Sequence, residues 1–264
     1  MQNILRYVYA LWSFASLILL ILIFGVLSIV LQILFIKSKK AHFWLLRSFS
    51  KAYLLLCQIK VCIEGLENIP ESGNFILISN YQSDIQHLAF LAYFPRRFRF
   101  IMSNVLARSP FFGRMLKSAG HIPITDLMLE KQGPWGRSYS VEKAIHHLKN
   151  GEIIFILPEG HISLTGNMGP FNPGVVVMAY ESGRSIIPCA VTGAHEIAPP
   201  PDYSKIGNIG GHLLKIFLIW TLNCIKTFKC GEIKIKIGTP IRIKSMDSPE
   251  TEAKKLKSII QDML

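Results

Sequence analysis

The sequence predicts an α/β domain preceded by a membrane helix or a pair of such helices. After Lys60, short apolar runs bounded by Gly, Pro and Asn alternate with longer amphipathic stretches, which is the pattern of alternating strands and helices. Before it, Tyr9 to Ile36 is almost continuously apolar and exceeds the roughly 20 residues that cross a bilayer as a helix. Half of the 264 residues are hydrophobic and 17% are charged, which excludes a disordered chain and an ordinary soluble enzyme.

Residues 1–58 are expected to anchor the chain in the membrane. The run Tyr9–Ile36 is too long for the roughly 7–15 apolar residues of a cleaved signal peptide. The amphipathic stretch Ala41–Cys57 is expected to lie on the membrane surface, unless both helices form a re-entrant hairpin that does not cross. Basic residues concentrate after the apolar run, so the positive-inside rule places the rest of the chain in the cytoplasm; they are Lys37, Lys39, Lys40, Arg47 and Lys51.

Residues 59–264 are expected to form the α/β domain. The predicted strands are Ile59–Glu64, Asn74–Ser79, Arg99–Met102, Gly120–Ile124, Ile153–Leu157, Ile186–Val191 and Glu232–Ile237. The predicted helices are Ser109–Ser118, Ser140–Lys149 and Gly174–Gly183. Isoleucine and lysine alternate along Glu232–Ile237, so one face of this strand is predicted to be buried and the other to be basic. That basic face is interpreted as solvated or, alternatively, as a contact for lipid headgroups.

The charge balance predicts an anionic partner. Lys and Arg number 29 against 17 Asp and Glu, a net charge of +12. Phospholipid headgroups, nucleic acid and a phosphorylated ligand all satisfy this, and the apolar segments favour membrane lipids. The cluster Pro95–Phe100 interleaves arginine with phenylalanine, and beside a membrane anchor it suits anionic headgroups better than nucleic acid. The five cysteines show no metal-binding spacing, so no metal site is expected.

Three blocks of sequence carry the residues expected to act in chemistry. They are Asn74 to Asn80 followed by Tyr81-Gln82-Ser83-Asp84-Ile85-Gln86, then Arg108-Ser-Pro-Phe-Phe-Gly113 with Gly120-His-Ile-Pro-Ile-Thr-Asp126, and Ile153–Leu157 followed by Pro158-Glu159-Gly160-His161-Ile162. With Gly169-Pro-Phe171 and Ile187-Pro188, in this order and spacing, they resemble the glycerolipid acyltransferase family, which includes the bacterial 1-acylglycerol-3-phosphate acyltransferases. The resemblance implies a mixed sheet flanked by helices. It also implies acyl transfer from acyl-CoA or acyl carrier protein to a hydroxyl of a phosphorylated glycerol, with no cofactor.

The residues at the family's catalytic positions differ from those that the reaction needs. The family's first block carries a histidine and an aspartate five positions apart, and these positions hold Tyr81 and Gln86 here. A hydroxyl acceptor needs a base such as histidine to remove its proton, with a carboxylate to orient the imidazole and stabilise its charge. A phenol with a pKa of about 10 is protonated at neutral pH, and glutamine carries no charge. The family's dyad is therefore predicted to be absent.

The family's substrate-binding motif positions correspond to Thr125, Asp126, Glu159, Gly160, His161 and Ile162 in this chain. Glu159 and Gly160 match the family, whereas the other four differ from it. Asp126 places a negative charge where the family usually has arginine, and Ile162 replaces a second arginine. Glycines and prolines of the scaffold resemble the family nearly throughout, so the fold is predicted to be retained while the catalytic residues are lost.

Two main hypotheses follow. The first is a membrane-bound acyltransferase fold without appreciable acyl transfer, which retains binding of lipid or of an acyl chain and acts with a protein partner that the sequence leaves unknown. The second is a working acyltransferase that uses substitute residues such as His161 and Asp84, on an acceptor that lacks phosphate. A structural membrane protein without a ligand is a third interpretation. Glu159 is expected to brace its loop, and His121 to pack in the core.

Overall fold

The computed structural model of this chain describes residues 2–34, 38–102, 104–109, 112–123, 139–201 and 227–264. Its helices are α1 (Gln2–Ile33), α2 (Lys39–Leu56), η1 (Leu66–Asn68), α3 (Ile85–Tyr93), α4 (Asn104–Arg108), α5 (Phe112–Ala119), α6 (Tyr139–Lys149), α7 (Gly174–Ser182), α8 (Ala194–Ile197) and α10 (Pro249–Met263). Its strands are β1 (Ile59–Glu64), β2 (Ile76–Ser79), β3 (Phe98–Met102), β4 (Ile122–Pro123), β5 (Ile153–Ile156), β6 (Ile186–Thr192) and β7 (Gly231–Ile237). Each predicted strand and helix that lies in these ranges is present, with ends that differ by a few residues.

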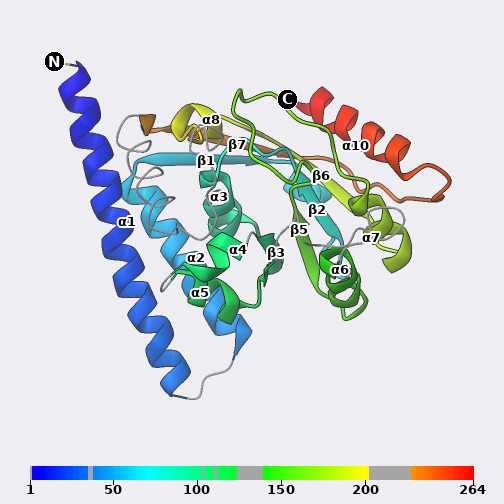
Figure 1. The fold of residues 1–264 in the computed structure, drawn as a ribbon, viewed down its shortest axis with the longest axis horizontal. Coiled ribbons are helices and arrows are strands. Elements are labelled where there is room, and N and C mark those ends of the chain that lie inside the picture. The colour runs from blue at the N-terminus through cyan, green and yellow to red at the C-terminus, as the bar shows by residue number, and fades with distance from the viewer. Residues whose placement is uncertain (1, 35–37, 103, 110–111, 124–138, 202–226) are drawn as a thin grey trace.

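The strands form one mixed sheet in the order β1-β7-β6-β2-β5-β3-β4 (Figure 1). All neighbouring pairs are parallel except β6 and β7, which are antiparallel. The α/β fold with a mixed sheet is therefore confirmed. Because β2, β5 and β6 run parallel side by side, the loops that follow them emerge at the same edge of the sheet.

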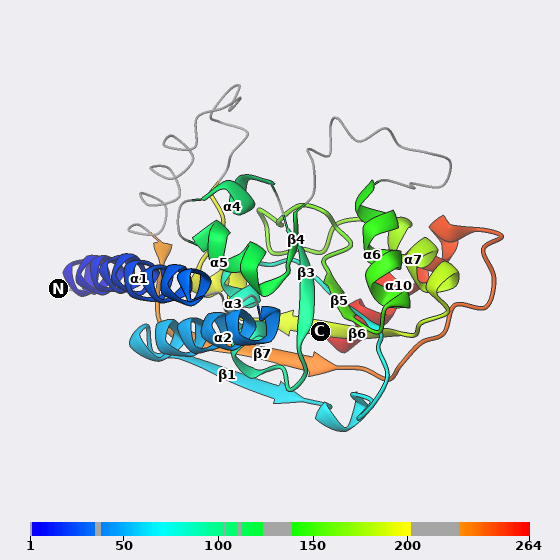
Figure 2. The same ribbon diagram turned by 90° about the horizontal axis from the view of Figure 1, so that it is seen from below.

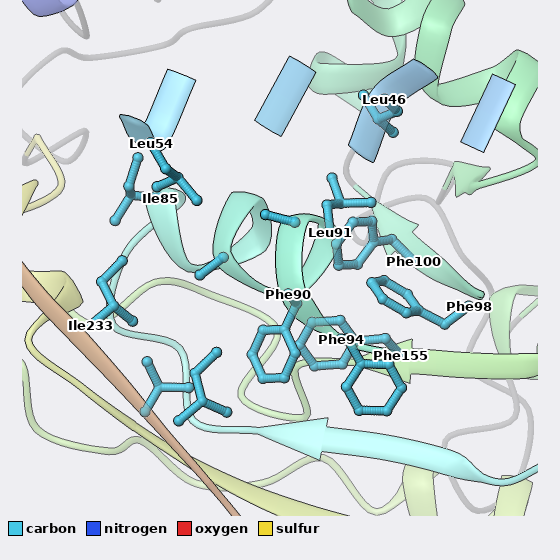
Figure 3. Packing of buried hydrophobic residues seen from close by; sticks show 14 of the residues in the cluster. Leu46, Leu54, Ile85, Phe90, Leu91, Phe94, Phe98, Phe100, Phe155 and Ile233 are labelled. Atoms are coloured by element: carbon cyan, nitrogen blue, oxygen red, sulfur yellow. The ribbon is translucent and has the colours of Figure 1, made fainter. Parts of the chain in front are cut away.

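Helices cover both faces of the sheet. One face packs against α2, α3 and α5, and the other against α6, α7 and α10, so the sheet lies between two helical layers (Figure 1). The first core is rich in phenylalanine: the rings of Phe90 and Phe155 lie 4.4 Å apart between α3 and β5 (Figure 3). Phe98 on β3 packs edge-on against Phe155 at 5.7 Å. This packing holds α3, and hence its N-terminal turn, rigidly over the sheet.

Helix α2 joins this core with one side, and its location on a membrane surface stays a prediction. Its apolar face, including Phe43, Leu46 and Phe49, is fully buried against the domain. Its outer side exposes Trp44 and Leu55. The amphipathic pattern was correct, but the buried face packs on protein because α3 and α5 present an apolar surface to it.

Helix α1 is long and apolar enough to cross a membrane: its Tyr7–Ile33 stretch has 27 residues, and an 18-residue window within it has a mean hydropathy of 3.0. It lies beside α2 (Figure 2) and is bonded to the domain near both of its ends. The Tyr9 hydroxyl donates to the carbonyl of Cys57 near the start, and Gln32 donates to the Ser118 hydroxyl at 3.0 Å near the end. The side of α1 that faces away from the domain is apolar and exposed.

Besides the short helices η1, α4 and α8, the structure contains two longer helices that the sequence pattern did not predict, and it changes the interpretation of one arginine-rich cluster. α3 and the highly charged α10 were not recognised as separate helices, although Ser248 and Pro249 form a typical helix start at α10. The arginines of Pro95–Phe100 were interpreted as headgroup ligands, but Arg96 donates to the carbonyls of Pro70 and Gly73. Arg99 is buried in β3 and pairs with Glu152.

Candidate active site

The residues singled out from the first and third sequence blocks gather at the edge of the sheet where β2, β5 and β6 end. Asn80 follows β2 directly, and its side chain extends the sheet by pairing with β6. The Asn80 amide donates to the Val191 carbonyl at 2.9 Å, and the Val191 N–H donates to Asn80 Oδ1 at 2.8 Å. Asn80 is 1% exposed, so this pair fixes where the chain leaves β2. The next residue, Tyr81, therefore starts from a fixed position.

Gln86 is fully buried on the first turn of α3 and makes four hydrogen bonds. Its Oε1 accepts from the backbone N–H groups of Gln82 and Ser83 at 2.8 and 3.2 Å. Its Nε2 donates to the Asn80 carbonyl at 2.7 Å and to Ser79 Oγ at 3.1 Å. An amide satisfies both sets of partners, whereas a carboxylate has no proton to give to the carbonyl. Gln86 therefore acts as a brace for the loop between β2 and α3.

Tyr81 and Asp84 form the outer part of this loop. The Tyr81 hydroxyl donates to Asp84 Oδ1 at 2.7 Å, and Asp84 is exposed. The ring of His87 lies edge-on to Tyr81, with centroids 5.4 Å apart, and also contacts Phe100 at 5.0 Å. Burial lowers the pKa of His87, an effect that the nearby Asp84 opposes. The histidine in this region is therefore an aromatic neighbour of Tyr81 and is held neutral.

Glu159 braces the third block, as predicted. It follows β5, is 6% exposed, and accepts from the backbone N–H of Tyr81 at 2.7 Å and of Gly169 at 2.7 Å. Burial raises the pKa of its carboxyl group, and the two N–H donors oppose that rise. Ser163 N–H donates to the Tyr81 carbonyl at 3.0 Å. Both backbone polar groups of Tyr81 are thus bonded to the loop after β5.

The loop 159–169 curls around a hollow of about 490 Å³. Gly160 adopts a left-handed φ of 71° that turns the chain directly after Glu159. Gly169 lies so close that a Cβ there would be 3.1 Å from Glu159 Oε2 and 3.4 Å from His161 Nε2. The hollow is lined by residues of this one loop: Glu159, His161, Ile162, Ser163, Leu164, Thr165, Asn167 and Gly169.

The structure brings together Tyr81, Asp84, Gln86 and the loop that carries Glu159, Gly160, His161 and Ile162. Thr125 and Asp126 lie outside the described residues. His121 is buried as predicted, and its Nδ1 accepts from the backbone N–H of Phe100 at 2.9 Å. Within the described ranges, no group of three or more His, Cys, Asp or Glu could hold a metal ion.

Asn80 and the bracing role of Gln86 were missed at the level of sequence. A polar residue directly after a wholly apolar strand was the available signal for Asn80. For Gln86 the sequence showed only an uncharged amide at a position where the resemblance implies an aspartate. Its four partners come from the backbone conformation of a loop, which no local pattern of residues specifies.

A family model described as Acyltransferase matches residues 60–192, just over half of the chain. The chain belongs to this acyltransferase family. The matched region contains Tyr81, Gln86, Glu159 and His161, so the loops described above lie within it. The predicted resemblance to 1-acylglycerol-3-phosphate acyltransferases is confirmed.

Curated relatives carry that activity in their names. The 1-acyl-sn-glycerol-3-phosphate acyltransferase LPAT1, chloroplastic, of Arabidopsis thaliana is 29% identical over 141 residues, which cover 53% of this chain and 38% of the plant protein. The 1-acyl-sn-glycerol-3-phosphate acyltransferase of Borreliella burgdorferi is 30% identical over 149 residues, which cover 56% of this chain and 58% of the relative. The matches thus span less than two thirds of either relative.

The fold is that of a solved member. The crystal structure of the 1-acyl-sn-glycerophosphate (LPA) acyltransferase PlsC from Thermotoga maritima superposes with a TM-score of 0.74 and covers 99% of this chain and 97% of that one. The two sequences are 22% identical, so the likeness establishes the fold alone.

Proposed function

We propose that this protein is a membrane-associated member of the acyltransferase family that binds a glycerolipid or its acyl chain. We also propose that it transfers little or no acyl group from acyl-CoA or acyl carrier protein to lysophosphatidic acid. The observation that carries the proposal is the environment of Gln86. The residue at the aspartate position is a fully buried amide whose donors and acceptors are all directed at the loop backbone and Ser79.

The chemistry of the two positions supports this proposal. Tyr81 stands where the general base is needed, and its proton already goes to Asp84. A phenol that keeps its proton at neutral pH does not remove one from an acceptor hydroxyl. Losing a general base costs about 100- to 10,000-fold in rate. The carboxylate acts through the base, so its loss adds little once the base is absent, and turnover close to background is expected from the missing base alone.

Membrane association is supported by α1. Its exposed side is apolar over most of its length, while the opposite side is bonded to the domain near both ends. Such a helix buries its outer side in lipid with the α/β domain alongside. We propose that the domain lies on the cytoplasmic face, because basic residues concentrate after the apolar run.

The alternative is an active acyltransferase that uses substitute residues. One observation favours it: Tyr81 and the exposed Asp84 form a phenol–carboxylate pair beside the loop of His161. In this case the acceptor hydroxyl passes its proton to the phenol oxygen while the phenol proton moves to Asp84. The thiolate released from the acyl donor then takes that proton, so the overall reaction conserves protons.

The deciding experiment is transfer of a radiolabelled acyl group from acyl-CoA to lysophosphatidic acid by the purified full-length protein in detergent. The matched variant carries Tyr81→His, Gln86→Asp, Asp126→Arg, His161→Thr and Ile162→Arg. The proposal is supported if the variant transfers the acyl group and the unmodified chain does not. Turnover by the unmodified chain at ordinary rates contradicts it, and loss of that turnover in Asp84→Asn or His161→Ala then supports the alternative. Circular dichroism of each preparation shows whether a silent protein is folded.

A further inference from the structure

We propose that the hollow of loop 159–169 takes an uncharged, hydroxyl-bearing lipid headgroup and discriminates against a phosphate monoester. This inference rests on the proposed function, because it names the ligand class of the same site. It differs from the acceptor that the curated relatives name, 1-acyl-sn-glycerol 3-phosphate.

The chemistry of the lining favours a neutral ligand. Ser163, Thr165 and Asn167 provide hydroxyl and amide groups, which donate and accept hydrogen bonds without charge. Among the described residues that line the hollow, none is lysine or arginine. A phosphate monoester carries up to two negative charges, and proteins that bind it use charge-assisted donors, above all arginine. At Ile162 the wall offers an apolar side chain instead.

The carboxylates around the hollow act against an anion. Glu159 lies in its wall with both oxygens bound to backbone N–H groups. Asp84 is exposed and linked to the same loop through Tyr81, whose hydroxyl binds Asp84 and whose carbonyl accepts from Ser163. Lys257 of α10 and His161 lower the pKa of Glu159 and so offset part of its charge, but Lys257 is not among the lining residues. Among the described residues of the wall, a phosphate would therefore meet the carboxylate of Glu159 and neither lysine nor arginine.

The size of the hollow and the position of its loop fit a small headgroup. Its volume of about 490 Å³ lies in the range of ordinary small-molecule sites, roughly 300–1,000 Å³. The loop is held in place by Glu159, which bonds its far end at Gly169 to the start of the β2–α3 loop at Tyr81. The hydroxyl and amide groups are thus presented on a braced loop beside the position where the family carries out acyl transfer.

The test compares two lipids with the same acyl chain, 1-oleoylglycerol and 1-oleoyl lysophosphatidic acid. Binding of each to the full-length protein in detergent is measured by equilibrium titration with radiolabelled lipid. We expect 1-oleoylglycerol to bind at least about 10-fold more tightly, since a phosphate loses its charge-assisted partners. The inference is wrong if lysophosphatidic acid binds as tightly as 1-oleoylglycerol or more tightly. It is also wrong if neither lipid shows saturable binding.

Ile162→Arg places a guanidinium on the wall of the hollow, and Ile162→Gln is its uncharged control. We expect the arginine variant to bind lysophosphatidic acid about 10-fold or more tightly than the unmodified chain, with little change for 1-oleoylglycerol. The glutamine variant is expected to leave the preference unchanged. If arginine has no effect on either lipid, the headgroup does not lie in this hollow and the inference is wrong.

An acyl-transfer assay with both lipids on the same preparations separates this inference from the proposed function. Turnover with 1-oleoylglycerol supports the alternative function, an active acyltransferase, and also supports the neutral ligand. Preference for lysophosphatidic acid without turnover contradicts the ligand class and leaves the proposed function standing.

Discussion

This site contains two sets of residues that differ in burial, although each residue of one set is close in sequence to a residue of the other. The inner frame, which comprises Asn80, Gln86 and Glu159, is buried, and its polar atoms bond the ends of β2, β5 and β6 together. The outer rim comprises Tyr81, Asp84 and His161, and both Asp84 and His161 are exposed.

The comparison indicates that the frame stabilises the fold, and we propose that any chemistry at this site involves the rim. A buried polar atom without a partner costs free energy, so each frame residue must match its partners in donors and acceptors. A rim residue meets water when its partner is lost. Gln86 links the two sets: we propose that it stands at a catalytic position of the family, and its hydrogen bonds make it part of the frame.

The largest effect is expected from Glu159→Ala, which breaks the frame. The change leaves the N–H groups of Tyr81 and Gly169 without their acceptor. We expect it to lower the free energy of unfolding by about 2–4 kcal/mol. Thermal unfolding of the detergent-solubilised protein measures this loss. Glu71→Ala, at an exposed glutamate, is the matched control and is expected to change stability by no more than about 0.5 kcal/mol.

Gln86→Asp sharpens the comparison, because it restores the family's residue at a position that now belongs to the frame. A carboxylate cannot donate to the Asn80 carbonyl, so we expect a loss of about 1–3 kcal/mol. Gln86→Glu keeps the size of the side chain and removes the donor, and it is expected to destabilise by a similar amount. Should Gln86→Asp unfold at the temperature of the unmodified protein, Gln86 is not a frame residue.

His121 extends the comparison to pH, because it is buried like the frame residues but can titrate. Burial, with Arg99 and His87 nearby, lowers the pKa of His121 to about 3 in the folded protein, against about 6.5 when unfolded. Between these values the unfolded chain binds the extra proton, so stability is complete above about pH 6.5 and falls as the pH drops, by up to about 1.4 kcal/mol per unit. Unfolding of His121→Gln from pH 7 to 5 is expected to show a shallower decline, and an unchanged slope contradicts the assignment.

The smallest effect is expected at the rim. Tyr81→Phe removes the hydroxyl that donates to the exposed Asp84, and bonds of this kind contribute about 0.5–1 kcal/mol or less. Thermal unfolding is expected to change little. If Tyr81→Phe lowered the free energy of unfolding as much as Glu159→Ala, Tyr81 would belong to the frame, and the division between frame and rim would be wrong.

The site could be predicted in part. The blocks around Tyr81 and Glu159 located it, because their turns follow apolar strands whose parallel ends meet at one edge. The bracing role of Glu159 was also expected, since a glutamate before a glycine turn has backbone N–H groups within reach. The bonds of Asn80 with Val191 were not predictable, since these residues lie far apart in the chain and meet through the pairing of β2 with β6.

The sequence by itself determined the order of the strands, the apolar helix at the N-terminus and the presence of Tyr81 and Gln86 where the resemblance implies histidine and aspartate. These features are local: each depends on the period of apolar residues or on the identity of a side chain at a known position. Only the tertiary structure decided that α2 buries its apolar face in the core and that Gln86 is a brace. Both depend on which surfaces and backbone groups the fold brings within reach, and the hydrogen bonds of a buried amide are set by those neighbours.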